Sequence, residues 1–251
     1  MTDLVVLDLF ACEGGATVGY MRAGFDVYAV DLDAARLKYN PAKHKLVADA
    51  LDVLVRLARG EAIVFDDGAV LTLEMVTLVH MSPPCQFYTI GQNGGGNRDK
   101  WPALIEPCRE LASALGVPYV IENVKGAESH LVDPVGLCGC MFGLSTIDTD
   151  GIRIHLQRLR LFEASWALEP PRECDHSEHE WVAGAYGGAR RDKYEAKYVR
   201  KGGYVPKEKA VVQSLLGAEH DMTWAGLFES IPPAYAEWVG LSARQESIRR
   251  G

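Results

Sequence analysis

Short apolar runs alternate with amphipathic segments through the first half of the chain. The continuous apolar runs favour buried strands, and they span residues 4–10, 26–30, 45–48, 75–81 and 118–121. Apolar residues recur at helical spacing, which predicts helices, over residues 16–23, 51–59 and 105–115. Strands that alternate with helices indicate an α/β domain in which helices cover both faces of a parallel sheet.

The pattern becomes irregular after Phe162. Residues 165–220 are rich in Gly, Tyr, Lys and Pro and show weak periodicity, which predicts a small loop-rich insert. Helical spacing returns at residues 224–228 and 233–241, where Pro233 suits a first helical turn. We therefore expect three parts: a large α/β domain over residues 1–164, a small region over 165–222 and a C-terminal segment over 223–251.

The composition is that of a globular protein, with 251 residues of which 48% are hydrophobic and 24% charged. These values exclude disordered, low-complexity and collagen-like chains, and no apolar run reaches the roughly 18–20 residues of a membrane span. The first residues carry Asp3 and Asp8 and no cationic lead, so we expect no secretory signal. The six cysteines are then expected to be reduced thiols in the cytoplasm.

Charge is distributed unevenly along the chain. Residues 181–209 carry eight basic and three acidic side chains, whereas the whole chain has a net charge of −8. Affinity for phosphate groups comes from Lys and Arg, so this stretch indicates a local basic patch on an acidic body. A solvated basic loop would give the same pattern.

Reactive and acidic side chains stand where the predicted strands end. They are Asp8, Asp31, Asp49, Cys85 and Glu122. Sheets of this kind bind ligands at the carboxyl ends of their strands. These residues are therefore the candidates for a functional site.

The segment DLFACEGGATVG, residues 8–19, joins the first strand to the first helix. Its glycines allow a ligand close to the backbone and to the helix N-terminus, and Asp31 is placed to accept both hydroxyls of a ribose. Cys12 and Glu13 replace the first glycine of the dinucleotide motif, and acidic residues would repel a pyrophosphate. The pattern favours a nucleoside cofactor without phosphates, such as S-adenosylmethionine, although a plain strand–helix turn would look similar.

Three further motifs carry reactive groups. In SPPCQFYT two prolines fix Cys85 at the end of a strand, as a nucleophile or as a structural thiol. In IENV the carboxyl of Glu122 follows an apolar pair and is a candidate acid or hydrogen-bond partner. In QRLRLFE Arg158 and Arg160 alternate with leucines, which predicts two guanidinium groups on one side of a strand, or an exposed amphipathic edge.

Together these motifs resemble those of the DNA cytosine-C5 methyltransferases, particularly short phage and prophage members. DLFACEGG, PPCQ, ENV, RLRLF and SIPPAYAEWVG follow one another in the family's order from Asp8 to Gly240. The resemblance implies a Rossmann-like S-adenosylmethionine-dependent methyltransferase sheet with a small loop-rich target-recognition insert. Residues 1–164 would form the catalytic and cofactor-binding domain, 165–222 the target-recognition region, and 223–251 would return to the catalytic domain beside the cofactor site.

The resemblance also implies roles for individual residues. The Cys85 thiolate would add to C6 of a cytosine flipped from the duplex, Glu122 would hold N3 and the exocyclic amine, and Arg160 would hold O2. Arg158 would orient the site or contact phosphate. S-adenosylmethionine would be bound by Asp8, Phe10, Cys12, Glu13, Gly14, Gly15, Asp31, Leu32, Asp49, Ala50 and Pro84.

The chain departs from the family pattern at three places. Cys12 stands where the family has glycine, and Leu156 stands where it has glutamine two places before the first arginine. The asparagine often found shortly before the closing helix is missing, and Glu229 and Ser230 stand near that position. The glycine-rich stretch 91–96 is expected to be a mobile loop that could close over DNA.

Five further residues could in principle bind zinc, namely Cys138, Cys140, Cys174, His176 and His179. The long gap between the two groups and the C-G-C spacing favour ordinary loop residues. The sequence therefore predicts no metal ligand.

The expected partner is double-stranded DNA, bound through residues 181–209 by a monomer in the cytoplasm of a bacterium or phage-infected host, with no membrane involved. The same chemistry on RNA, such as tRNA, is an alternative. A catalytically silent DNA-binding relative is another, although such a protein has no need of Cys85, Glu122 and Arg160 together.

Overall fold

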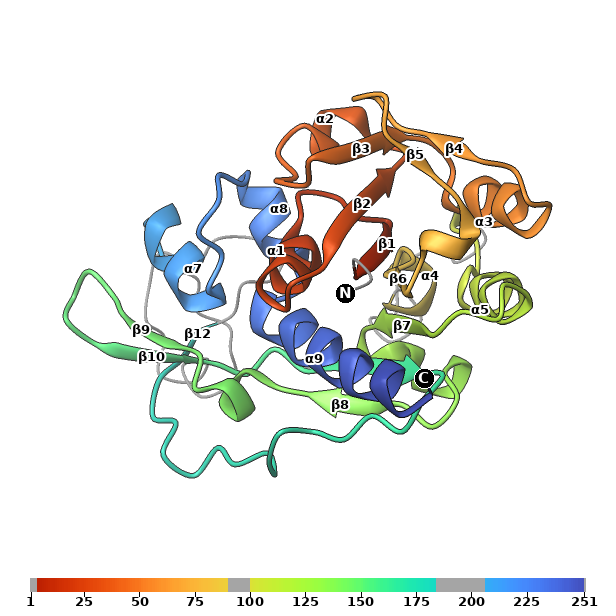
Figure 1. Ribbon diagram of the computed structural model, residues 1–251. Coiled ribbons are helices and arrows are strands. Elements are labelled where there is room, and N and C mark those ends of the chain that lie inside the picture. The colour runs from red at the N-terminus through yellow and green to blue at the C-terminus, as the bar shows by residue number, and fades with distance from the viewer. Residues whose placement is uncertain (1–3, 90–99, 184–205, 251) are drawn as a thin grey trace.

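The computed structural model describes residues 4–89, 100–183 and 206–250. Its centre is a seven-stranded sheet with the strand order β3-β2-β1-β6-β7-β11-β8 (Figure 1). The first five strands of this order are parallel, and β11 runs antiparallel to both β7 and β8. The strands are β1 (Val5–Leu9), β2 (Asp26–Asp31), β3 (His44–Val47), β6 (Leu78–Met81), β7 (Tyr119–Asn123), β8 (Val135–Leu137) and β11 (Arg160–Ala164). The predicted α/β fold is confirmed, with a sheet that is parallel except for β11.

The apolar runs form the central strands because these strands are buried on both faces. All five residues of β1 and all four of β6 are buried. The run at residues 75–81 is only partly a strand, since the 3-10 turn η1 (Leu73–Met75) precedes β6. That turn is half-exposed and leaves four residues to pair with β1 and β7.

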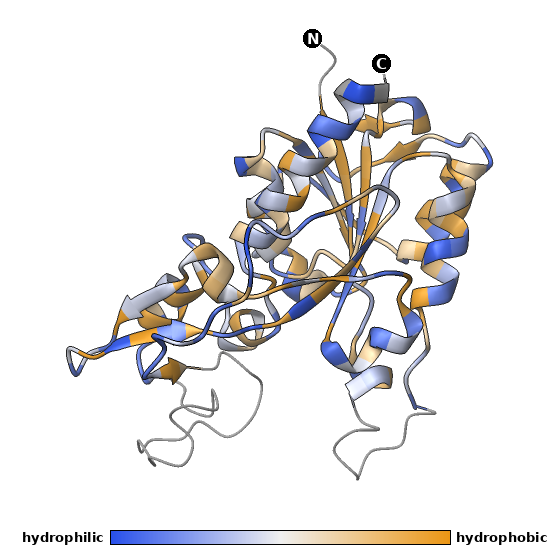
Figure 2. Cartoon of the chain, turned by 90° about the horizontal axis from the view of Figure 1, so that it is seen from below, coloured by the Kyte–Doolittle hydropathy of each residue, from blue (hydrophilic) through white to orange (hydrophobic). Residues whose placement is uncertain are grey.

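Helices cover both faces of the sheet (Figure 2). On one face α3 (Ala50–Ala58) and α5 (Ile105–Ala114) contribute to one hydrophobic core. On the other face α1 (Gly15–Arg22) and α9 (Pro233–Arg250) share a second core. Helix α9 is longer than the predicted 233–241. Gly19 permits the close approach of α1 and α9, because a Cβ atom there would lie 2.2 Å from the carbonyl oxygen of Pro233.

A smaller unit lies at one end of the sheet, on the left of Figure 1. Its three-stranded sheet and two helices enclose a third hydrophobic core. They are β9 (Ser145–Ile147), β10 (Arg153–Leu156), β12 (Val182–Ala183), α7 (Lys209–Leu216) and α8 (Trp224–Glu229). The unit thus takes strands from both sides of residue 165, and the sequence pattern did not predict α7. The division at 1–164, 165–222 and 223–251 stays a prediction.

The remaining elements are short. They are α2 (Ala34–Leu37), α4 (Gln86–Thr89), the hairpin strands β4 (Ile63–Val64) and β5 (Val70–Leu71), and the 3-10 turns η3 (Lys125–His130) and η4 (Gly139–Phe142). Within the described ranges, no helix combines the length and hydrophobicity needed to cross a bilayer.

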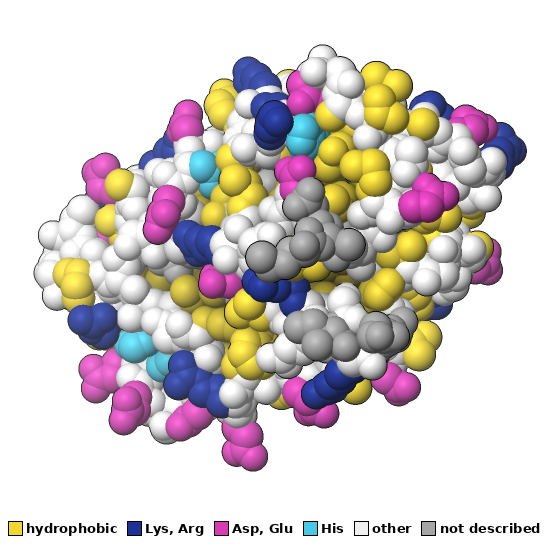
Figure 3. All heavy atoms as spheres, in the orientation of Figure 1, with side chains coloured by type: hydrophobic (Ala, Val, Ile, Leu, Met, Phe, Trp, Pro, Cys, Tyr) yellow, Lys and Arg dark blue, Asp and Glu magenta, His cyan; other side chains and the backbone are white. Residues whose placement is uncertain are grey.

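Two predicted features lie largely outside the described residues. The glycine-rich stretch 91–96 does so entirely, and the basic stretch 181–209 is described only at its two ends. At its C-terminal end Lys209 Nζ pairs with Asp221 Oδ1 at 2.8 Å. On the face seen in Figure 3, acidic and basic side chains are interspersed around the rim, and the described side chains there form no continuous basic surface.

Candidate active site

The carboxyl ends of the parallel strands bring the candidate residues to one edge of the sheet. Met81 pairs with Ile121 in the β6–β7 ladder, so Ser82 and Glu122 follow at the same level. On the other side of β7, Phe162 of β11 pairs with Glu122. The antiparallel direction of β11 is what carries Arg160 to this edge.

Glu122 and Arg160 form an ion pair at this edge. Arg160 Nε lies 3.2 Å from Glu122 Oε1, and Glu122 is only 6% exposed. Burial raises the pKa of the Glu122 carboxyl above its usual range, while the Arg160 cation, a hydrogen bond from Ser82 and the Arg158 cation act in the opposite direction. This carboxyl is therefore easier to protonate than an exposed one, as a group that donates a hydrogen bond to a base must be.

A buried chain of hydrogen bonds leads from α1 to Glu122. Tyr20 Oη lies 2.8 Å from His80 Nδ1, and His80 Nε2 lies 2.7 Å from Ser82 Oγ. Burial lowers the pKa of His80 to about 3, so its ring is neutral at physiological pH. A neutral imidazole has one donor and one acceptor. With Tyr20 donating to Nδ1, Nε2 donates to Ser82, whose own hydroxyl proton is then left for Glu122.

No sequence pattern marks Tyr20, His80 or Ser82 as site residues. His80 was detectable in principle, because it is a polar residue inside the apolar run 75–81. A residue there must find buried partners or weaken the strand. Its partner Tyr20 could not be identified, because that residue is 60 positions away in the sequence.

The turn that carries Cys85 is fixed on both sides. Asn123 Nδ2 donates to the carbonyl oxygen of Pro83 at 2.8 Å, which ties β7 to the turn. The carbonyl oxygen of Cys85 accepts from the backbone N–H groups of Tyr88 and Thr89 in α4. Cys85 itself is partly exposed and not disulfide-bonded. Cys85 is thus held in a fixed and partly exposed position in the turn after β6.

The two arginines of the RLRLF motif have different positions. Arg160 begins β11, but Arg158 lies in the irregular connection between β10 and β11, so the prediction that both share one side of a strand is wrong. Arg158 is fully buried, its Nη2 donates to the carbonyl oxygen of Phe228, and its own carbonyl oxygen accepts from Tyr235 Oη at 2.6 Å. A guanidinium without exposed surface offers nothing to a phosphate in this arrangement.

The turn after β1 has an unusual backbone. Phe10 (φ 60°) and Cys12 (φ 46°) are left-handed without being glycine, and Gly14 (φ 91°) is left-handed as well. Asp31 supports this turn, because its Oδ2 accepts from the Cys12 N–H at 2.8 Å. Its Oδ1 accepts from the Asp33 N–H at 2.8 Å. Each carboxylate oxygen has room for a second hydrogen bond, so Asp31 can support the turn and still bind a ligand hydroxyl.

The same turn is attached to the C-terminal part of the chain. Glu13 is 1% exposed, and its two carboxylate oxygens accept from the backbone N–H and the hydroxyl of Thr223, both at 2.6 Å. A Cβ atom on Gly15 would lie 2.1 Å from Ser230 Oγ. The Glu13 side chain therefore bonds to the start of α8, and its carbonyl oxygen lies 2.6 Å from His220 Nε2.

Asp8 is a buried acid beneath this turn. Its Oδ2 accepts from Thr17 Oγ1 at 2.6 Å, and its Oδ1 is buried with no hydrogen-bond partner among the described residues. Burial raises the pKa of Asp8 to about 7, against the hydrogen bond from Thr17. An unsatisfied carboxylate oxygen inside a protein is a place for a missing donor or cation.

The other cofactor candidates border the same strand ends. Leu32 is 66% exposed directly after Asp31. Asp49 is exposed and caps α3, its Oδ1 accepting from the N–H groups of Leu51 and Asp52. Ala50 is buried and Pro84 partly buried. Carboxylates beside an exposed aliphatic side chain fit the hydroxyls, amine and flat face of a nucleoside better than they fit phosphate.

Neither a family model nor a curated protein sequence matches the chain. Solved structures do match. A prophage-encoded E. coli protein assigned as a DNA modification methyltransferase is 14% identical with a TM-score of 0.56, over 98% of this chain and 100% of that one. The methyltransferase EhMeth of Entamoeba histolytica is 13% identical with a TM-score of 0.52, over 98% and 99%. The Dnmt2 methyltransferase of S. pombe is 14% identical with a TM-score of 0.52, over 97% and 99%.

The chain has a Rossmann-like methyltransferase fold. The matches cover nearly the whole chain, so the fold likeness extends through the small unit as well as the sheet.

The structure also brings together four of the five zinc candidates. Ligand atoms of Cys138, Cys140, Cys174 and His176 all lie within 4.8 Å of one another, whereas His179 is outside this group. The expectation that these are ordinary loop residues does not account for such a convergence.

Proposed function

We propose that this chain is a DNA cytosine-C5 methyltransferase that transfers a methyl group from S-adenosylmethionine to a flipped cytosine through a covalent Cys85 adduct. The observation that carries the proposal is the buried Glu122–Arg160 pair, which follows the same strand ends as the Pro-Pro-Cys turn. The fold shared with three methyltransferases supports it.

The turn after β1 fits the proposed cofactor. Asp31 would bind the ribose hydroxyls, Leu32 would cover the adenine, and Asp49 would accept from the adenine amine. The unpartnered Oδ1 of Asp8 fits the positive end of a methionine moiety. When bound, S-adenosylmethionine would supply an electrophilic methyl group on a sulfonium.

Cys85 would activate the cytosine ring. Its thiolate would form a bond to C6, which moves electron density to C5 and makes that carbon a nucleophile. After methylation, loss of the C5 proton and cleavage of the C6–Sγ bond would restore the aromatic ring and the thiolate. The partly exposed position of Cys85 at a fixed turn supports this role.

Glu122 and Arg160 would hold the base during addition. A protonated Glu122 would donate to N3 and so withdraw electrons from C6, which favours attack by the thiolate. Arg160 would bind O2 through nitrogen atoms not used by Glu122. Arg158, buried behind the pair and fixed by Phe228, would be a positioning residue.

The choice of DNA over RNA rests on the family that the motifs resemble and on the DNA modification assignment of one structural neighbour. The target would be bound by residues 181–209 in the 165–222 region, by a monomer in the cytoplasm. Extrusion of the base from a duplex would cost a few kcal/mol.

The test is nucleoside mass spectrometry of DNA and small RNA from cells that express the parent or Cys85→Ala. We expect 5-methylcytosine in DNA with the parent only. Modification confined to RNA would keep the chemistry and overturn the substrate. A folded parent that binds S-adenosylmethionine and modifies neither nucleic acid would favour a silent DNA-binding protein.

A further inference from the structure

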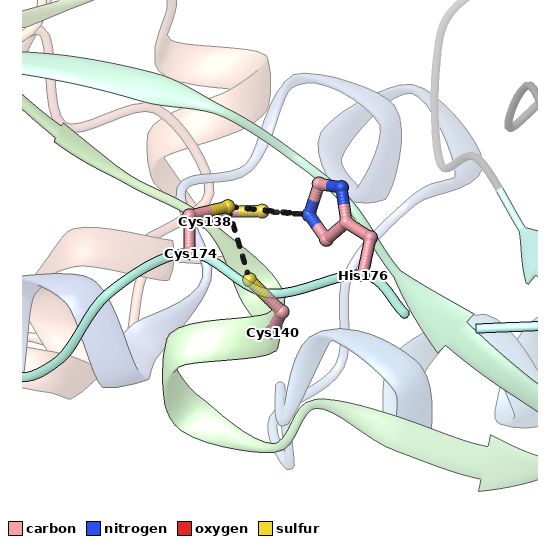
Figure 4. Close-up of side chains that lie close together, drawn as sticks. All are labelled: Cys138, Cys140, Cys174 and His176. Carbon is pink, nitrogen blue, oxygen red and sulfur yellow. Dashed lines mark hydrogen bonds between the residues drawn. The ribbon is translucent and has the colours of Figure 1, made fainter. Parts of the chain in front are cut away.

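We propose that Cys138, Cys140, Cys174 and His176 bind a structural zinc ion that fixes the path from the central sheet to the small unit. The four side chains converge on one point from two separate segments (Figure 4). Cys138 and Cys140 lie at the end of β8 and in η4, and Cys174 and His176 lie in the irregular segment after β11. This site is independent of the proposed methyl transfer.

The distances within the cluster are close to those of ligand atoms around a small ion. Cys138 Sγ lies 3.2 Å from His176 Nε2, and Cys174 Sγ lies 3.3 Å from the same nitrogen. The sulfur atoms of Cys140 and Cys174 are 3.3 Å apart. Bonds of about 2.3 Å to sulfur and 2.0–2.1 Å to nitrogen in a tetrahedron place ligand atoms roughly 3.5–3.8 Å apart. These three pairs would have to move slightly apart, and the more distant atoms, which lie within 4.8 Å, would have to move slightly closer, to complete the coordination.

The ligand set selects zinc. Three cysteines and one histidine are a structural zinc set with no open position, and soft sulfur ligands in a tetrahedron do not suit Mg²⁺ or Ca²⁺. A disulfide between Cys140 and Cys174 would need their sulfur atoms about 2.05 Å apart, and it would not explain why Cys138 and His176 point at the same place (Figure 4).

The cluster lies in a segment that is held mainly by side-chain contacts, among them the hydrogen bond from Trp166 to Ser242 and the buried Leu168. Between β11 and β12 the described chain contains no helix or strand. Trp238 Nε1 donates to the Glu169 carbonyl oxygen and Arg172 Nε to the Met141 carbonyl oxygen, both before Cys174. A zinc ion would bond to two ligands from this segment and to two from the η4 side, and so join the two at the point where the segment leaves η4.

Beyond the cluster the chain enters the small unit directly. His176 stacks on His179 at 5.4 Å, and His179 stacks on His155 of β10 at 4.2 Å. His179 Nδ1 also lies 3.1 Å from Gln157 Nε2, next to Arg158. The ion would thus hold the end of the central sheet and the entrance to the small unit in one arrangement.

The test uses the full chain purified under reducing conditions from zinc-supplemented cells, without a histidine tag. Elemental mass spectrometry should find one zinc ion per chain in the parent protein. The zinc should be lost in the variants Cys174→Ser and His176→Asn. Both ligands are exposed, so these variants should keep the fold, which circular dichroism checks. His179→Gln is the matched control, because it removes a neighbouring histidine outside the cluster and should retain the metal.

Two further measurements make the result specific. Cobalt(II) added to the metal-free parent should give the intense visible bands of a tetrahedral site and thiolate charge-transfer bands, both absent in Cys174→Ser. Chelation should speed proteolysis and hydrogen exchange in residues 165–183 more than in the sheet. A metal-free parent, a Cys140–Cys174 disulfide, bound iron, or zinc retained in full by Cys174→Ser would each overturn the proposal.

Discussion

Arg160 Nε meets Glu122 Oε1 at 3.2 Å across two antiparallel strands of the central sheet. The pair is almost completely buried, so each group neutralises a charge that would otherwise be costly at that depth. Its position at the ends of β7 and β11 is where the proposed cytosine would lie. The pair therefore stabilises the fold and also belongs to the proposed site. Substitutions that keep its shape should distinguish its effect on stability from its effect on methyl transfer.

Glu122→Gln should abolish most of the methyl transfer and keep the fold. Glutamine preserves the shape and can contact Arg160, but it cannot deliver a proton to N3. General acid catalysis typically contributes 10²–10⁴-fold, and we expect a loss of kcat in this range with cofactor binding unchanged. Single-turnover kinetics measures it, with Glu128→Gln on the exposed η3 as a matched control. Activity within a factor of two of the parent would exclude Glu122 as the acid.

Ser82→Ala should shift the pH dependence of the reaction. The hydroxyl of Ser82 lowers the pKa of Glu122 by a hydrogen bond to its ionised form, so its removal raises that pKa further. If the protonated carboxyl is the active form, the fall of kcat on the alkaline side should move to higher pH. Ser82→Thr keeps the hydroxyl and should keep the parent profile. If the ionised carboxylate were the active form, the rise of kcat on the acidic side would instead move to higher pH, and the fall on the alkaline side would stay in place.

Asp8→Asn should change how stability depends on pH. Because burial raises the pKa of Asp8 to about 7 from 3.8, the folded protein binds a proton that the unfolded chain releases. The stability that this bound proton contributes is complete below pH 3.8 and is lost as the pH rises through 7. The free energy of unfolding falls by up to about 4 kcal/mol over this range. Urea unfolding at several pH values should show the parent losing stability relative to Asp8→Asn over this range. Saturating S-adenosylmethionine should reduce the difference, and two parallel stability curves without ligand would contradict the assignment.

Cys12 offers a test of the strained turn. At φ 46° a side chain with a Cβ atom is disfavoured by roughly 1–2 kcal/mol. Cys12→Gly should therefore be more stable than Cys12→Ala by about 1 kcal/mol, although glycine is usually the less stable of the two. Both variants lose the contact of Cys12 Sγ with Arg36, so their comparison isolates the backbone. Chemical denaturation measures the difference, and an alanine variant as stable as the glycine variant would show that the turn relaxes.

The strands were predictable because parallel strands buried on both faces leave continuous apolar runs in the sequence. The run 75–81 shows the limit of this signal, since apolar residues also occur in the half-exposed turn at Leu73–Met75. Alternation suggested a strand through both Arg158 and Arg160, but the chain leaves β10 after Leu156 and starts β11 only at Arg160.

Contacts between distant segments could not be predicted. The strand-end position of Glu122 followed from its local pattern, but its partners Ser82 and Arg160 depend on strand order and register. The Cys138–His176 cluster is the clearest case, because Cys140 and Cys174 are 34 positions apart and their spacing fits no common zinc motif. Only the path of the chain after β11 brings the two pairs together.

The contacts of Gly15 with Ser230 and of Gly19 with Pro233 have a consequence for the order of folding. The turn after β1 is complete only when the segment around Ser230 has docked against it, although the two lie far apart in the sequence. An intermediate in which the central sheet has formed but α9 is undocked would lack one wall of this turn. Such an intermediate should bind the proposed cofactor weakly, so affinity for the cofactor would report the docking of α9 rather than the formation of the sheet.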